Sequence, residues 1–474
     1  MDKYKRLVSN TILFAISTFS SKILNFFLTT YHTHMMGTGA YGSMDAIIAI
    51  GNVFIPIVSL GISNAIIRFG LEKGVNKRSL YTNGLLSLLL GFMILLILTP
   101  LLDLVPFIGG TIGDYWPLLL IFVFTSCLRT LNCQFVRARE MVRLYAIDGI
   151  LCTIANLFFN VLFLSGFHLG ATGLILALIC SDASSALFLF FVSRIWKYIR
   201  FRRIDTRLFQ TMLRYSVPLI SASIFWWVTN TSDKLFINSM LGSEVNGLFA
   251  TSYRLPTLLT IVATLFTEAW QISAFTDGTR AGREEFFSRV WNAYQSVMFL
   301  AGAGIILLCQ PIMKVYVSDA FYAGWVYIPL LTFATVFSSF DNFLNSIYMA
   351  EKRSGLSLIT MAVGAVLNLI LNGLLIPRWG VQGAAFATFA SYFVVFLLRA
   401  VNTRGLIRVD FAPFVLFLNL ALMGFESYWM LTDTPLWPLW CSLCVLLMAI
   451  LNFSSLWDTA KHILAMGKRR KARH

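Results

Sequence analysis

The sequence predicts an all-α integral membrane protein with about fourteen transmembrane helices, and three observations carry this prediction. Hydrophobic residues make up 58% of the 474 residues and charged residues only 12%, whereas soluble chains carry about 25% charged residues. The apolar residues form long runs, close to the ~20 residues that a helix needs to cross a hydrocarbon core of ~30 Å. A duplicated pattern also runs through most of the chain. The alternating in-and-out pattern of a membrane β-barrel is absent from these runs, so helices are favoured.

Reading the apolar runs in order gives two sets of six expected spans and a final pair. The expected spans are Asn10–Tyr31, Met44–Ile67, Leu80–Leu102, Trp116–Val136, Ala146–Phe167, Gly170–Val192, Ser216–Ile237, Gly247–Ala269, Ala293–Val315, Trp325–Met349, Leu356–Ile376, Val381–Val401, Phe411–Leu431 and Leu436–Leu456.

The distribution of basic residues orients these spans. With the N-terminus in the cytoplasm, 32 of the 37 lysines and arginines fall on the cytoplasmic side. A miscounted span would invert every later loop and destroy this asymmetry, so we expect both termini to be cytoplasmic. The net charge of +15 then reflects topology and contact with anionic lipid. We expect no nucleic-acid partner, because no soluble domain with interleaved aromatic residues accompanies the basic tail.

The duplication is read from short motifs that recur at a nearly fixed offset. The motif Asn-Leu-Phe-Phe-Asn at 156–160 recurs as Asn-Leu-Ile-Leu-Asn at 368–372, which is 212 residues later, and the glycines of 170–173 recur at 380–383. Met36-Gly37 with Tyr41-Gly42 corresponds to Leu241-Gly242 with Asn246-Gly247. Duplicated halves of membrane transporters usually enclose a central site, which makes transport the first functional class to consider.

The repeat also divides the chain into three expected parts. These are an N-terminal six-helix lobe (1–197), a C-terminal six-helix lobe (206–404) and an extra helix pair with a basic cytoplasmic tail (405–474). An even number of spans keeps both repeats in the same orientation, so their pseudo-twofold axis should lie along the membrane normal. No G-x-x-x-x-G-K-[ST] phosphate loop is present in the sequence, so ATP hydrolysis by that route is excluded.

Two groups of motifs resemble a known family. The second half carries Asn372-Gly373-Leu374-Leu375-Ile376-Pro377, then Gly380, Gly383-Ala384-Ala385 and Ala387-Thr388; the first half carries Met36-Gly37, Tyr41-Gly42, Ser59-Leu60-Gly61-Ile62 and Ile67-Arg68-Phe69. This pattern resembles the polysaccharide-biosynthesis flippases (O-antigen, capsule or teichuronic type) of the multidrug/oligosaccharidyl-lipid/polysaccharide exporter superfamily. The family's usual leucine before the first glycine is Met36 here, which is a conservative departure.

The resemblance implies a V-shaped two-lobe transporter and not an enzyme. It implies a flippase that moves an undecaprenyl-pyrophosphate-linked oligosaccharide from the inner to the outer leaflet of the bacterial cytoplasmic membrane by alternating access. Membrane lipids would surround it, and a polysaccharide polymerase and assembly proteins would be its partners. The helix pair near the C-terminus could guide the lipid tail. A peptidoglycan lipid II flippase and a cation-coupled multidrug antiporter of the same superfamily remain the alternatives.

Ionisable groups inside the spans are the functional candidates, because they are costly in hydrocarbon unless they line a cavity or find a partner. Lys22 lies in the middle of the first span, and Arg254 lies within the eighth. One cation from each lobe, facing a shared cavity, would suit a phosphate or pyrophosphate group, since arginine binds it in a bidentate manner and lysine acts as a point charge. The alternative is a structural ion pair of either cation with Asp45 or Asp233.

The remaining candidates complete the expected site. Arg68 at the inner mouth, Asn25 and Trp227, whose ring could stack on a sugar, are further substrate-binding candidates; Asp45, Asp233, Lys234 and Glu268 are candidates for charge pairs or ion coupling. Asp148, Asp182 and Asp341 could bind a proton or sodium, although pairing with arginines at the inner face is the favoured interpretation for Asp148. We expect no cofactor and no metal site; the coupling ion would be H+ or Na+, or the membrane potential alone would drive transport.

Overall fold

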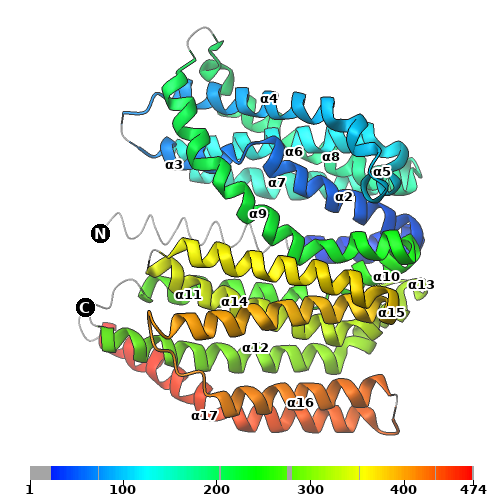
Figure 1. The fold of residues 1–474 in the computed structure, drawn as a ribbon, viewed down its shortest axis with the longest axis vertical. Helices are drawn as coiled ribbons and strands as arrows, with labels where there is room; N and C mark the ends of the chain where they lie inside the picture. The colour runs from blue at the N-terminus through cyan, green and yellow to red at the C-terminus, as the bar shows by residue number, and fades with distance from the viewer. Residues whose placement is uncertain are drawn as a thin grey trace. The chain divides into compact units, whose positions relative to one another are not determined.

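The protein is described by a computed structural model that covers residues 23–72, 74–201, 204–274, 280–351, 353–432 and 434–471. Throughout these ranges the regular structure is helical, which confirms the predicted all-α fold (Figure 1). A first helix covers residues 23–35. The others are α2 (Thr38–Val58), α3 (Ile62–Gly70), α4 (Lys77–Asp103), α5 (Pro106–Ile112), α6 (Trp116–Ala138), α7 (Val142–Asn160), α8 (Gly170–Val192), α9 (Thr206–Leu241), α10 (Ser243–Ser252), α11 (Thr257–Ala274), α12 (Arg280–Tyr316), α13 (Asp319–Tyr322), α14 (Ile328–Ala350), α15 (Ser354–Thr403), α16 (Pro413–Leu431) and α17 (Trp437–Lys471).

Short tight turns join several of these helices. They are 3-10 helical turns at Gly113–Tyr115, Ile195–Tyr198 and Ala323–Tyr327. A π-helical segment at Val161–Gly166 directly follows α7. Among the described residues, ten helical segments are long and apolar enough to cross a membrane, and one of them, Gly355–Thr403, contains two of the spans expected from the sequence. The chain is therefore a multi-pass membrane protein.

The chain separates into two compact units, Met1–Ala250 and Thr251–His474. The division falls inside α10, so α9 packs within the first unit, mainly against α2 and α3. In the second unit α14 packs along α15, and α12 packs against α16 and α17. The lobe boundaries expected from the repeat, 1–197 and 206–404, stay a prediction.

The second expected span is broken in the structure. The sequence predicted one helix over Met44–Ile67, but the structure has α2 and α3 separated at Ser59-Leu60-Gly61. Leu60 and Gly61 both have positive φ, 51° and 61°, a conformation that glycine adopts at little cost. A side chain at Gly61 would also press on the backbone oxygen of Ser216 in α9, 2.8 Å from the ideal Cβ position. The break therefore serves a close contact between α3 and α9.

The glycines that open the last span of each repeat are needed for the backbone conformation and not for close packing. An added Cβ at Gly170 or Gly380 would meet nothing within 4 Å, so neither glycine marks a close helix approach. They adopt φ values of 54° and 59°, which β-carbon-bearing residues rarely do. The chain turns at Gly380, three residues after Pro377, where the sequence had placed the helix end. Gly383 does make a close approach, to the backbone of Leu375.

The duplication is visible in the helices themselves. The bounds of α6 and α14 differ by 212 residues at both ends, the same offset as that between the two asparagine motifs. In each motif the second asparagine donates its side-chain amide to the first, Asn160 to Asn156 at 2.8 Å and Asn372 to Asn368 at 3.1 Å. Each asparagine pair therefore shares one helix face.

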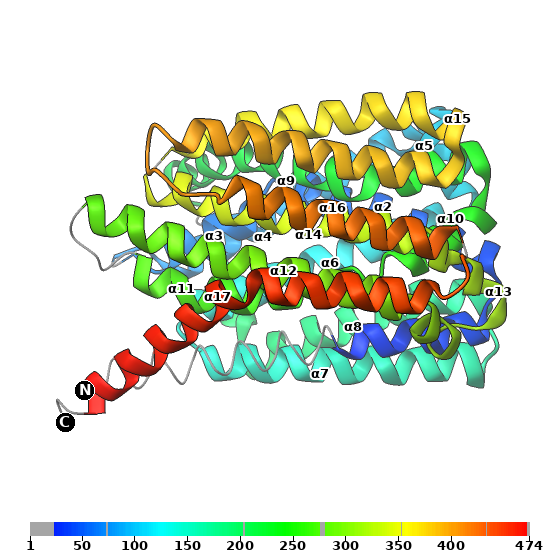
Figure 2. The ribbon, with the colours of Figure 1, turned by 90° about the horizontal axis from the view of Figure 1, so that it is seen from below.

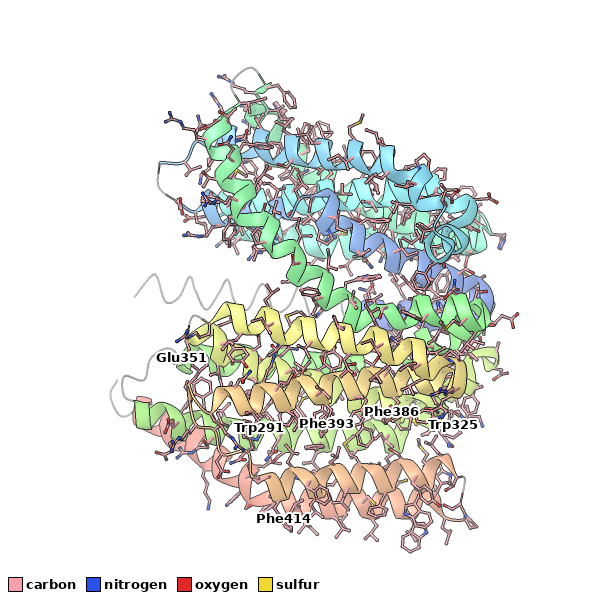
Figure 3. All side chains as sticks on the ribbon, viewed as in Figure 1. Trp291, Trp325, Glu351, Phe386, Phe393 and Phe414 are labelled. Carbon is pink, nitrogen blue, oxygen red and sulfur yellow. The ribbon has the colours of Figure 1, made fainter. Side chains whose placement is uncertain are left out.

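Aromatic side chains form the core of the second unit. Trp291 of α12, labelled in Figure 3, lies 4.9 Å from Phe340, 5.3 Å from Phe343 and 5.8 Å from Phe396, measured between ring centroids. The C-terminal helices α16 and α17 run side by side and pack on α12 (Figure 2). At their contact the side-chain amides of Asn419 and Asn452 bond to each other, at 2.8 and 3.2 Å, so two polar groups satisfy one another inside an apolar pair.

Candidate functional site

A pocket of about 490 Å³ opens within the first unit, between α3 and α9. Its walls combine one cation, one amide, one phenol and one hydroxyl with aliphatic side chains, a mixture that suits a ligand with both polar and apolar parts. The lining residues are Asn64, Ile67, Arg68, Leu71, Tyr215, Leu219, Ala222 and Ser223.

Two contacts fix the positions of the helices that line the pocket. Ser216 donates its hydroxyl to the backbone oxygen of Leu60 at 2.8 Å, which fixes α9 to the break between α2 and α3. The rings of Phe69 and Tyr215 meet edge to face with centroids 5.7 Å apart. The local sequence explains this arrangement. The positive φ at Leu60 and Gly61 changes the direction of the chain before α3, and Pro218 lies inside α9. The two helices therefore pack closely where Ser216 meets Leu60.

Arg68 is the cation of this pocket and was a candidate from the sequence. Its guanidinium lies 3.1 Å from the Glu72 carboxylate one turn later, and the two side chains are 58% and 41% exposed. An exposed pair at this spacing contributes only about 0.3–0.5 kcal/mol. Arg68 can therefore exchange Glu72 for an anionic ligand at little cost.

Three further candidates, Asp45, Lys234 and Trp227, form two contacts that join α2 to α9. The Lys234 ammonium lies 2.7 Å from the Asp45 carboxylate, and both side chains are largely buried, at 19% and 11% exposure. One helical turn further along α2, the Trp227 indole N–H donates to the backbone oxygen of Ala49 at 2.8 Å. The sequence had considered Lys22 or Arg254 as partners of Asp45, and these pairings stay a prediction; Lys234 is a further partner that the structure shows.

The other sequence candidates lie in different surroundings. Lys22 lies outside the described residues, as does the side chain of Glu268. Asn25 is exposed on the first helix, and Asp233 is 1% exposed on α9. Arg254 was expected inside a continuous span, but it lies in the turn between α10 and α11, where its backbone N–H donates to Thr251 at 3.1 Å.

Sequence reasoning missed three polar lining residues of the pocket, Asn64, Tyr215 and Ser223. Each is a neutral polar residue without a charge or a motif, so the sequence alone does not distinguish it from other polar residues in the spans. It also did not foresee that Asp148, Asp182 and Arg129 form one network on α6, α7 and α8, although it proposed arginine partners for Asp148.

Comparisons with known proteins agree with this fold. The profile of the family described as "Polysaccharide biosynthesis protein" matches residues 7–271, more than half of the chain. A protein of Haloferax volcanii described as a probable low-salt glycan biosynthesis flippase is 24% identical over 209 residues, which is 43% of each chain. The chain thus spans less than half the length of this relative. An uncharacterised membrane protein of Methanocaldococcus jannaschii is 21% identical over 414 residues, 83% of this chain and 96% of that one.

Solved structures share the fold at low sequence identity. A lipid II flippase in an inward closed conformation superposes with a TM-score of 0.69 at 15% identity, covering 96% of this chain and all of that one. An inward-facing multidrug resistance transporter has a TM-score of 0.63 at 15% identity, covering 83% and 98% of the two chains. The resemblance read from the glycine and asparagine motifs is thus confirmed, and this chain belongs to the polysaccharide biosynthesis protein family.

Proposed function

We propose that the chain is a flippase that moves an undecaprenyl-pyrophosphate-linked oligosaccharide from the inner to the outer leaflet of a bacterial cytoplasmic membrane. Family membership carries this proposal, together with a fold that matches a lipid II flippase over nearly its whole length. Such a substrate has an anionic headgroup and a polar glycan that hydrocarbon excludes, so it needs a polar path across the bilayer. Alternating access of the two repeats would supply that path, with both termini in the cytoplasm.

The pocket of the first unit supports a role in holding the headgroup. Arg68 offers a planar pair of donors that matches phosphate oxygens, and its bond to Glu72 is weak. Asn64 and Ser223 offer further hydrogen bonds, and Tyr215 offers an aromatic face for a sugar ring. Lys22, Arg254, Asn25 and Trp227 stay substrate-binding candidates from the sequence.

The inside-negative membrane potential would assist outward movement of the headgroup. Each elementary charge that crosses gains about 2.3 kcal/mol per 100 mV. A pyrophosphate carrying roughly two charges would gain about 4–5 kcal/mol over the same field.

Substitution of Arg68 tests the headgroup role in cells. We expect Arg68→Ala to reduce the amount of surface glycan by at least about tenfold, because it removes a charge-assisted hydrogen bond worth about 1.5–3 kcal/mol. Glu72→Gln is the matched control, because it removes the exposed partner and leaves the cation; it should display glycan at the wild-type level. Surface glycan is measured by lectin binding, and protein abundance by immunoblotting of membranes. Equal glycan display by Arg68→Ala and wild type would remove Arg68 from the mechanism.

A further inference from the structure

A buried polar network joins three helices of the first unit, away from the α3–α9 pocket. Asp148 of α7 accepts hydrogen bonds from the Ser185 hydroxyl at 2.7 Å and the Cys133 thiol at 3.3 Å. The Ser185 oxygen in turn accepts from Arg129 Nε at 3.1 Å. Arg129 also lies 3.3 Å from the Asp182 carboxylate, to which Ser126 donates.

The charges of this network do not balance when all three ionisable groups are charged. It holds two carboxylates against one guanidinium, and the ion pair joins Arg129 to Asp182. Asp148, only 1% exposed, receives hydrogen bonds from neutral donors alone. The groups that face it are Arg129 and Cys133 from α6, Asp182 and Ser185 from α8, and Cys152 on its own helix. One bound proton would bring the network to neutrality, and an uncompensated buried charge is costly.

The corresponding helices of the second repeat also hold a buried polar network, but it contains one carboxylate fewer. At the offset of 212 residues, Arg129 corresponds to Asp341 and Asp148 corresponds to Thr360. Arg399 donates to the Thr360 hydroxyl at 3.0 Å and to the backbone oxygen of Asp341 at 2.7 Å. This copy therefore holds one cation and one carboxylate. At the position of Asp148 the second repeat therefore has no ionisable group.

The hydrogen bonds around Asp148 suit both protonation states. When the carboxylate is ionised, the Cys133 thiol donates to Oδ2; when Oδ2 carries a proton, that O–H can donate a hydrogen bond to the sulfur, which is a weak acceptor, and the proton stays on the oxygen. Ser185 keeps its bond to Oδ1 in both states. At the other end of the network Arg129 is 32% exposed and Asp182 13%, so the chain of bonds from Asp148 ends at the surface of the unit.

We propose that Asp148, with Ser185, Arg129 and Asp182, forms a site for one exchangeable proton in the first repeat. Release transfers the proton from the carboxylic acid to a water molecule and leaves the carboxylate, with no change in oxidation state. A further step rests on the proposed flippase function: binding and release of this proton couple proton movement to flipping. The equivalent position of the second repeat, Thr360, has no carboxyl group to bind a proton.

Infrared difference spectroscopy of the purified full chain in lipid nanodiscs tests proton binding without any glycan substrate. The readout is the C=O stretch of a protonated carboxylic acid. It is recorded between about pH 5 and about pH 9, the range in which buried carboxyl groups commonly titrate. Asp148→Thr reproduces the residue of the second repeat, and Asp148→Asn is an independent variant of similar shape. Asp341→Asn is the matched control in the second repeat.

The expected result is a carboxylic acid component that fades as the pH rises, is absent from both Asp148 variants and is kept in Asp341→Asn. Other buried carboxyl groups, such as Asp341 and Glu426, contribute equally to both spectra and cancel in the wild-type minus Asp148→Thr difference. Three results would overturn the proposal: no such band in the wild-type minus Asp148→Thr spectrum, a band that does not change with pH, or a band that sodium chloride abolishes at constant pH. The last would identify a site for a sodium ion. Size-exclusion profiles and helical circular dichroism identify any variant that fails to fold, and Asp148→Asn then replaces Asp148→Thr.

The coupling step has a separate test, so that its failure is distinct from failure of the flippase assignment. In proteoliposomes, flipping by the wild type should change at least about threefold when a pH gradient is imposed, and flipping by Asp148→Asn should not respond. Flipping that ignores the gradient in the wild type would reject coupling while leaving the flippase function intact. No flipping under any condition would reject the flippase function and leave the spectroscopic result standing.

Discussion

At the scale of single residues, the contact between Lys234 and Asp45 shows how the fold pairs charges that the sequence leaves open. Both side chains are largely buried in the first unit, and their charged atoms are 2.7 Å apart. Removing one member of a buried pair strands the other charge and costs about 3–5 kcal/mol. Replacing both members by neutral groups avoids that penalty.

We therefore expect Lys234→Met to lower the thermal unfolding midpoint of the purified protein in detergent by several degrees. The double variant Asp45→Asn/Lys234→Met should lie closer to wild type than Lys234→Met alone. If the single and double variants unfold at the same temperature as wild type, the ion pair makes no contribution to stability.

The glycines that open the last span of each repeat allow a second residue-level prediction. Gly380→Ala and Gly170→Ala place a Cβ at positive φ and should each destabilise the protein by about 1–2 kcal/mol, although the space around them is empty. Gly373→Ala is the control, because its surroundings are equally open and its φ is not positive. It should be neutral or stabilise by up to about 1 kcal/mol. Chemical unfolding in detergent provides the comparison; equal effects at Gly373 and Gly380 would refute the backbone explanation.

At the scale of elements, the two copies of the Gly-containing motif meet each other in the first unit. A Cβ on Gly42 of α2 would overlap the backbone oxygen of Ser243 in α10, and a Cβ on Gly247 would overlap the backbone oxygen of Thr38. The four residues are related by the offset of 205 residues, so the crossing is self-complementary. Asn246 adds a bond from its side-chain amide to the backbone oxygen of Gly42 at 2.7 Å.

This crossing should not tolerate a methyl group. Gly42→Ala must push α2 and α10 apart, an overpacking cost of about 1–3 kcal/mol or more. Gly39→Ala is the matched control on the same helix, since its Cβ would meet only side-chain atoms of Glu244 and Ser243 at 3.2 and 3.4 Å and a backbone nitrogen at 4.0 Å. Thermal unfolding of the purified variants should rank Gly42→Ala well below Gly39→Ala. The reverse order would show that the two helices do not meet at these glycines.

The elements were largely predictable, because the thickness of the membrane sets the length of the apolar runs and its orientation sets the charge of the loops. The bounds of α6 and α8 agree with the expected spans within about two residues, which is the usual error of such readings. The break at Leu60-Gly61 was not foreseen, because its cause is a contact with Ser216 more than 150 residues away. The pocket was only partly foreseen for the same reason: Arg68 has a charge that draws attention, whereas Asn64 and Ser223 become visible only when α3 and α9 pack together.

At the scale of the whole molecule, the chain is a duplicated helical membrane protein whose two copies have diverged in charge. The asparagine pairs and the positive-φ glycines Gly170 and Gly380 are present in both copies, where they serve the backbone. The ionisable residues of the buried network differ between the copies, because Arg129 and Asp148 correspond to Asp341 and Thr360. Groups that maintain the fold are thus shared, while the groups proposed to bind substrate and proton are particular to one copy.

The central claim is the flippase function, and reconstitution tests it most directly. Purified protein is placed in liposomes with an undecaprenyl-pyrophosphate oligosaccharide carrying a labelled sugar, and the fraction of label reached by a membrane-impermeant glycosidase is followed over time. We predict that the wild type exposes the inner-leaflet pool at least about tenfold faster than empty liposomes and faster than it exposes lipid II, and that Arg68→Ala loses most of this rate. A rate equal to that of empty liposomes, or a preference for lipid II, would contradict the proposed function.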